Sequence, residues 1–430
     1  MQISSHTLKG STVIKNDIQF ATLILTIRAY TPYTPAEHAL RLVYDEAITS
    51  GAGKYTRQDW LDALGILGAD ISVSSDDGFV SMQLLSIDSN LEKTLKLFLM
   101  LCSNPTFSEH ELIRIKTNLK NNLLLAKENS SAHAYQMFAS TIFKKNDRRT
   151  QYPIDTIIKE IDTISRADLQ RIHHSLWNYE WNYTCGGNTD SCSRIVRTIE
   201  KIFSMQNATP SPVYQSSASH TVPKIAVLLT DIPNKQNIDF SIGNALSLTR
   251  THPDFPALAL GLNVLGLAGG FAGRLMSTVR EKEGLTYGIY ARIEETTKDE
   301  SGVWRISTFF APKDAIRGLT STFREITNIC EKGITADELK RFKTIMHTRF
   351  ALIEDSLIKK VAEIHTLKKI GITDEAYTKY KTDIQTLTRT EVDRALHTYI
   401  YPSRILISGA GPITHVEKDI RNIEQSSSLK

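Results

Sequence analysis

The sequence predicts an α+β protein with two homologous halves, each a mostly antiparallel sheet flanked by helices. At 430 residues the chain is long enough for two or more domains with sizeable cores. Residues 205–222 are rich in Ser, Pro and Thr and have few apolar positions, which is typical of a linker. The pattern of strands and helices restarts after this stretch. We therefore expect a first domain at 1–204 and a second at 223–430.

An internal repeat supports the division into two halves. Residues 111–117 match residues 338–344 at an offset of 227, and residues 161–169 match residues 384–392 at an offset of 223. Two matches in the same order at nearly one offset indicate a duplication. The alternative is that both pairs are generic amphipathic helices.

The elements of the first half follow from the spacing of its apolar residues. Alternation with a period of two predicts strands, and apolar residues at helical spacing predict helices. The run Thr56-Arg57-Gln58-Asp59 is typical of a helix start. The expected strands are 12–15, 20–27, 70–74, 79–84 and 181–185, and the expected helices are 36–49, 56–67 and several between 89 and 177.

Composition and charge exclude several classes of function. The formal charge of +4 is small and spread out, and no basic stripe with interleaved aromatic residues indicates nucleic-acid binding. No apolar run approaches the roughly 18–20 residues of a membrane span. The first residues lack the charged and apolar segments of a signal peptide, so we expect a cytoplasmic protein. A periplasmic location stays open if the numbering starts after processing.

The four cysteines form no Cys-x-x-Cys pair and no disulfide framework. Cys185 and Cys192 could bridge in an oxidising compartment. Buried or idle thiols are the favoured interpretation for all four.

The stretch 269–290 of the second half carries the candidate chemistry. It opens with glycines, continues as a helix, and reaches Gly284 where a helix C-cap belongs. The period then changes to two over residues 285–293, which predicts a strand. Arg280 is expected in the last helical turn and Tyr287 just inside the strand, so a tight turn can bring them together. An Arg donor and a Tyr hydroxyl suit a peptide carbonyl or a developing oxyanion. The alternative is a solvated helix-end charge and a half-buried strand residue.

The run GRLMSTVREKEGLTYGIYA (residues 273–291) closely resembles the C-terminal-half motif of the insulinase/pitrilysin metallopeptidases, the inverzincins. In that family an Arg and a Tyr seven positions apart bind substrate and assist the metal site, and Arg280 and Tyr287 match them. The two-half organisation agrees with that family over nearly the whole chain. Gly269 and Gly270 resemble a glycine-rich loop that touches substrate in some of its metal-free subunits. Close helix packing or a flexible loop is the alternative for these glycines.

The zinc motif of that family is missing. Members that cut peptides carry His-x-x-Glu-His on a helix of the first half, and a downstream Glu completes the ligands. The aligned residues 42–46 read Leu-Val-Tyr-Asp-Glu, and we interpret Asp45-Glu46 as a solvated helix face. Glu37-His38 copies half of the motif, but Thr34 stands at the first ligand position. Residues 112–127, where the third ligand is expected, contain no acidic residue.

The resemblance therefore implies a subunit without catalytic metal in a two-chain zinc peptidase. Zinc is expected in a homologous partner subunit, and no cofactor in this chain. Arg280 would hold a carbonyl or carboxylate of a peptide substrate, and Tyr287 would donate to the oxyanion. The chain alone is expected to be inactive. A scaffold or binding protein of the same fold, without a proteolytic role, is the alternative. A third possibility is an enzyme of another chemistry, but no nucleophile motif, phosphate loop or dinucleotide fingerprint is visible.

Overall fold

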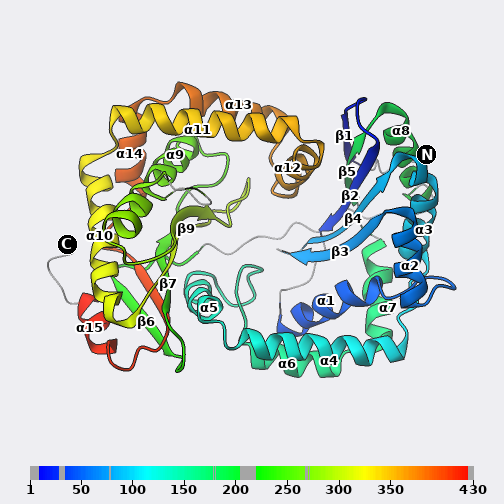
Figure 1. Ribbon diagram of the computed structural model, residues 1–430, viewed down its shortest axis with the longest axis horizontal. Coiled ribbons are helices and arrows are strands. Elements are labelled where there is room, and N and C mark those ends of the chain that lie inside the picture. The colour runs from blue at the N-terminus through cyan, green and yellow to red at the C-terminus, as the bar shows by residue number, and fades with distance from the viewer. Residues whose placement is uncertain are drawn as a thin grey trace, which may run out of the picture. The chain divides into compact units, whose positions relative to one another are not determined.

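The computed structural model describes residues 9–28, 34–76, 79–177, 179, 181–203, 219–266, 270 and 272–424. These residues form two compact units, each with one five-stranded sheet and helices packed on it (Figure 1). None of the helices in these ranges is long and apolar enough to cross a membrane.

The sheet of the first unit is antiparallel except at one edge. Its strands lie in the order β1-β5-β2-β4-β3, and only β1 and β5 run parallel. The bounds are β1 (Lys9–Ile14), β2 (Phe20–Arg28), β3 (Asp70–Asp76), β4 (Phe79–Ile87) and β5 (Trp181–Gly187). The expected strands of the first half are thus confirmed.

The sheet of the second unit repeats this topology strand for strand. The order is β6-β10-β7-β9-β8, and only β6 and β10 run parallel. The bounds are β6 (Ala226–Asp231), β7 (Ile238–Ala245), β8 (Ile289–Glu294), β9 (Val303–Phe310) and β10 (Leu406–Gly411). The predicted fold class, two homologous α+β halves, is therefore confirmed.

Helices fill the connections between the strands. In the first half they are α1 (Pro35–Ile48), α2 (Arg57–Leu67), α3 (Leu91–Ser103), α4 (Glu109–Ala126), α5 (Ser130–Ile142), α6 (Ile154–Thr163), α7 (Arg166–Trp177) and α8 (Thr189–Phe203). In the second half they are α9 (Phe255–Gly266), α10 (Ala315–Lys332), α11 (Ala336–Asp355), α12 (Leu357–Lys369), α13 (Asp374–Thr386), α14 (Arg389–Tyr399) and α15 (Glu417–Arg421). The predicted capping box at Thr56 is present, because its hydroxyl accepts the Asp59 N–H and its own N–H bonds to the Asp59 carboxylate.

The two halves exchange one helix. Helices α5 and α12 both have 13 residues and stand 227 positions apart, the same offset as one of the repeats. Helix α5 packs on β7 and β10 of the second unit, and α12 packs on β2 and β5 of the first (Figure 1). The first unit therefore takes its described residues from 1–124, 153–215 and 352–369, and the second from the remainder. These units differ from the expected domains 1–204 and 223–430, and most of the predicted linker lies outside the described residues.

Apolar packing holds each exchanged helix in place. Leu357 and Val361 of α12 are buried in a cluster with Val13 and Ile24 of the first sheet. Gly186 of β5 permits this close approach, because a Cβ there would lie 2.5 Å from Val361 Cγ2. Three buried residues of α5, Phe138, Ala139 and Ile142, pack with Ala245, Val303 and Leu406 of the second unit.

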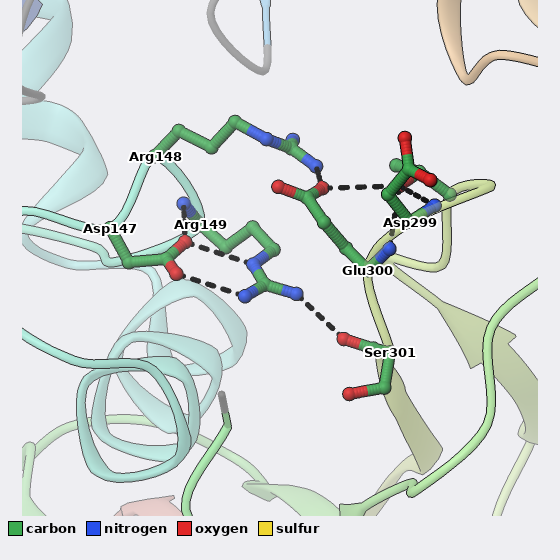
Figure 2. A network of polar contacts seen from close by, with 7 residues as sticks. Asp147, Arg148, Arg149, Asp299, Glu300 and Ser301 are labelled. Atoms are coloured by element: carbon green, nitrogen blue, oxygen red, sulfur yellow. Dashed lines mark hydrogen bonds and ion pairs between the residues drawn. The ribbon is translucent and has the colours of Figure 1, made fainter. Parts of the chain in front are cut away.

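A buried polar network holds the segment that follows α5 (Figure 2). The Arg149 guanidinium donates to both carboxylate oxygens of Asp147, at 2.9 Å each, and to the Ser301 carbonyl oxygen at 2.7 Å. Arg148 pairs with Glu300, and the side chains of both pairs are buried. Burial alone would raise the pKa of Asp147, but the bonds from Arg149 hold that pKa below its usual value. The network thereby fixes residues 147–149 against the loop between β8 and β9.

Candidate functional site

Arg280 is carried by a π-helical segment, Met276–Lys282, where an ordinary α-helix was expected. Its buried residues Met276 and Val279 anchor the segment in the core of the second unit. Gly284 follows with φ of 65°, and its N–H donates to the Arg280 carbonyl oxygen at 3.0 Å. This left-handed conformation is the reason for glycine at the position, as the C-cap prediction required. π-Helical turns are rare and occur frequently at functional sites.

Tyr287 does not lie in the following strand, and that prediction is wrong. Strand β8 begins at Ile289, and Tyr287 is 74% exposed, whereas Leu285 and Ile289 are buried. The reason is a local turn at Thr286. Its hydroxyl donates to the Gly288 carbonyl oxygen at 3.1 Å and accepts the Gly288 N–H at 3.2 Å. These bonds take the place of strand pairing and leave the Tyr287 side chain on the surface.

The structure brings the Arg280 and Tyr287 side chains into contact. The guanidinium carbon of Arg280 lies 4.3 Å from the centre of the Tyr287 ring. A cation over an aromatic face contributes about 0.5–1 kcal/mol at an exposed site. Within the described part of the chain, no hydrogen-bond partner of the Tyr287 hydroxyl is found. A cationic donor and a phenol donor are therefore presented together at the surface of the second unit.

The glycine loop is only partly described. Gly269 lies outside the described residues, and Gly270 is described without regular structure. The contact expected between these glycines and a substrate therefore stays a prediction. The nearby Gly266 fits the close-packing alternative, because a Cβ there would lie 2.8 Å from the Ala291 nitrogen and 2.9 Å from Leu275 Cδ1.

The same stretch lines a pocket that the sequence reasoning missed. Its volume is about 450 Å³, and its lining residues are Ala272, Arg274, Ser277, Glu281, Glu338 and Arg341. Arg274 donates to both carboxylate oxygens of Glu338, at 2.7 Å each, and to the Gly333 carbonyl oxygen at 2.8 Å. Arg274 lies in the motif of residues 273–291, and Glu338 is the first residue of the repeated segment 338–344. These two sequence patterns could have indicated the pocket.

The helix aligned with the zinc motif is α1, and its side chains do not fit zinc. Leu42 is apolar, and Glu46 is exposed. Asp45 is half-buried rather than solvated, which corrects the interpretation of this pair. Its carboxylate accepts the Ser75 backbone N–H at 2.7 Å and the Ser75 hydroxyl at 2.6 Å, and thereby ties α1 to β3. Burial raises the pKa of Asp45 from its usual 3.8 to about 6, although the bonds from Ser75 oppose the rise.

The described residues contain no group of three or more His, Cys, Asp or Glu side chains that could hold a metal ion. Two histidines of this region, His38 on α1 and His173 on α7, belong to no such group. The His173 ring bonds to the Tyr44 hydroxyl at 2.9 Å and to the Cys102 carbonyl oxygen at 3.0 Å. Burial lowers the pKa of both His38 and His173 to about 4. The donor set of this region therefore does not match a catalytic zinc site.

Comparison with known proteins agrees with the motif in residues 273–291. Residues 163–346 match the family model described as the peptidase M16 inactive domain. This part of the chain is therefore similar to the M16, or insulinase, peptidases. A solved structure of a peptidase M16 inactive domain from Pseudomonas fluorescens superposes with a TM-score of 0.80 and 20% identity, and covers 93% of this chain and 95% of that one.

Two further proteins show how far the likeness extends. An uncharacterized zinc protease of Streptomyces coelicolor is 20% identical over 314 residues, which are 72% of this chain and 66% of that protein. The matched residues thus span slightly less than two thirds of that relative. The periplasmic protease PqqL of Escherichia coli superposes with a TM-score of 0.73 and 15% identity, over 93% of this chain and 44% of PqqL. At these identities the structural matches show the fold alone.

Proposed function

We propose that this chain is the subunit without catalytic metal in a two-chain zinc peptidase. It would close a peptide chamber and supply Arg280 and Tyr287 to the substrate. The observation that carries the proposal is the contact between the partly buried Arg280 and the exposed Tyr287, at 4.3 Å from guanidinium carbon to ring centre. The donor set of α1, which does not fit zinc, supports a division of labour with a homologous metal-bearing subunit.

The two side chains have complementary roles in this proposal. The Arg280 guanidinium would hold a carbonyl or carboxylate of the peptide, because it is a permanent cation with several N–H donors. The Tyr287 hydroxyl would donate to the oxyanion of the tetrahedral intermediate. One such donor is typically worth about 2.7–4 kcal/mol of transition-state stabilisation. The partner subunit would supply the zinc, the general base and the attacking water.

The experiment is reconstitution with a homologous chain that carries His-x-x-Glu-His. Cleavage of an unfolded peptide is measured for each purified chain and for their mixture, together with the zinc content of each. We expect this chain to be inactive alone, and the mixture to be more active than the partner. The substitutions Arg280→Ala and Tyr287→Phe should each reduce that gain. Tyr401→Phe and Arg317→Ala are matched controls, because both side chains are exposed and lie outside the pair.

Two outcomes would contradict the proposal. Stoichiometric zinc and cleavage by this chain alone would show that the metal site lies elsewhere. A stable complex without any gain in cleavage would favour the scaffold alternative. The compartment stays open between cytoplasm and periplasm, where the similar protein PqqL is found.

A further inference from the structure

Two thiols meet at the edge of the first sheet. Cys185 lies in β5 and is paired with Thr12 across the parallel ladder to β1. Its sulfur lies 3.7 Å from the Thr12 hydroxyl, and the Cys192 sulfur on α8 lies 3.9 Å from the Val13 carbonyl oxygen. Both sulfurs therefore contact consecutive residues of one strand, although they come from different elements.

The two thiols also interact with each other. A hydrogen bond from Cys192 lowers the pKa of Cys185, and the same contact raises the pKa of Cys192. The charge of Lys368 on α12 further favours the Cys185 thiolate. Cys185 therefore loses its proton at a lower pH than an isolated buried thiol would.

Cys192 is only 2% exposed, but it lies in the wall of a pocket, whereas Cys185 lines none of the described pockets. Cys192 lines this pocket of about 390 Å³ together with Thr12, Ile14, Thr189, Ser193, Val196 and Arg197. Cys185 is completely buried behind it. The guanidinium of Arg197 favours an anionic reagent in this pocket, and glutathione carries carboxylates.

We propose that Cys185 and Cys192 are an oxidisable thiol pair that closes to a disulfide between β5 and α8 when a disulfide oxidant such as oxidised glutathione is present. The Cys192 sulfur attacks one sulfur of the oxidant, and its proton passes to the Cys185 thiolate. The S–S bond of the oxidant breaks, and one glutathione thiolate leaves. The Cys185 sulfur then attacks Cys192 in the mixed disulfide, and its proton leaves with the second glutathione. Two protein cysteines are oxidised, and one glutathione disulfide is reduced to two glutathiones.

The other two cysteines provide an internal control. The Cys102 sulfur contacts Met82 at 3.8 Å, and the Cys330 sulfur contacts the Ile400 carbonyl oxygen at 3.7 Å. Burial raises the pKa of both thiols, that of Cys330 to about 12. Neither has a second cysteine in contact, so both should stay reduced under the same conditions.

The test uses the full chain, oxidised glutathione, and alkylation of the remaining thiols after denaturation. We expect two alkylated cysteines, a mass lower by two hydrogen atoms before alkylation, and a peptide that links Cys185 to Cys192. In the Cys185→Ser variant the reaction should stop at a glutathione adduct on Cys192. In the Cys192→Ser variant no adduct should form on Cys185, because that thiol is enclosed.

Mapping the disulfide in the unsubstituted chain tests the proposal even if a variant fails to fold. Four alkylated cysteines after oxidation would overturn the proposal, and so would a bridge that involves Cys102 or Cys330. Cys102→Ser serves as the matched control and should leave the 185–192 bridge unchanged.

Discussion

Asp45 on α1 accepts two hydrogen bonds from Ser75 on β3, at 2.7 Å from the backbone nitrogen and 2.6 Å from the hydroxyl. In the alignment with the zinc motif, Asp45 falls on the position of the catalytic Glu. At the position where the motif has its catalytic Glu, this chain thus has a carboxylate that links helix α1 to strand β3. The link also places a carboxylate in a half-buried site.

The first prediction concerns the pH dependence of stability. Burial raises the pKa of Asp45 to about 6 in the folded chain, so the folded state binds the proton more tightly than the unfolded state. Stability from this group is present below its usual pKa of 3.8 and is lost as the pH rises through about 6. Lowering the pH from 7 to 5 should therefore stabilise the chain by about 1 kcal/mol through this group.

Urea unfolding of the native chain and of Asp45→Asn at both pH values measures this effect. The variant should lose most of that gain, whereas Glu46→Gln, on the exposed neighbour, should keep it. An unchanged pH response in Asp45→Asn would show that other groups dominate.

The second prediction separates the roles of the candidate pair in the reconstituted peptidase. Tyr287→Phe should lower kcat by about 100-fold or more, with little change in KM, because it removes a donor used in the transition state. Arg280→Ala should raise KM about tenfold or more, because a charged hydrogen bond to the ground-state peptide is lost. Steady-state kinetics measures both. Because Tyr287 is 74% exposed, Tyr287→Phe should not unfold the chain.

The third prediction concerns the exchanged helices. A chain of residues 1–204 lacks α12, and a chain of 223–430 lacks α5, so each would expose the sheet face that its missing helix covers. We expect each fragment alone to be unfolded or aggregated, and the two to fold together when co-expressed. Circular dichroism and co-purification test this. Two fragments that fold independently would contradict the importance of the exchange.

The fourth prediction tests one contact of that exchange. Gly186→Ala should destabilise the chain by about 1–3 kcal/mol, because close-packed interiors tolerate added atoms poorly. The new Cβ would lie 2.5 Å from Val361 and 2.9 Å from Leu357. Gly65→Ala is the matched control, because no atom lies within 4 Å of its added Cβ. In helix α2 that control should stabilise by about 0.5–1 kcal/mol. Denaturant unfolding that ranks the two variants equally would refute this account of α12 docking.

Several elements were predictable because local spacing determines them. The strands of the first half, the capping box at Thr56 and the left-handed Gly284 follow from short-range rules. The strand expected at Tyr287 failed because the Thr286 hydroxyl forms a local turn with Gly288, which alternation of apolar residues does not reveal. The solvated state expected for Asp45 failed because Ser75, its partner, is 30 residues away.

The sequence by itself determined the two repeated halves, the family motif around Arg280 and Tyr287, and the absence of histidine ligands on α1, since each is a matter of residue type at fixed spacing. Only the tertiary structure decided that α5 and α12 change places, that Arg280 packs on the Tyr287 ring, and that Cys185 and Cys192 contact consecutive residues of β1. The physical reason is that these relationships depend on which surfaces bury one another, and burial joins segments that local periodicity treats separately.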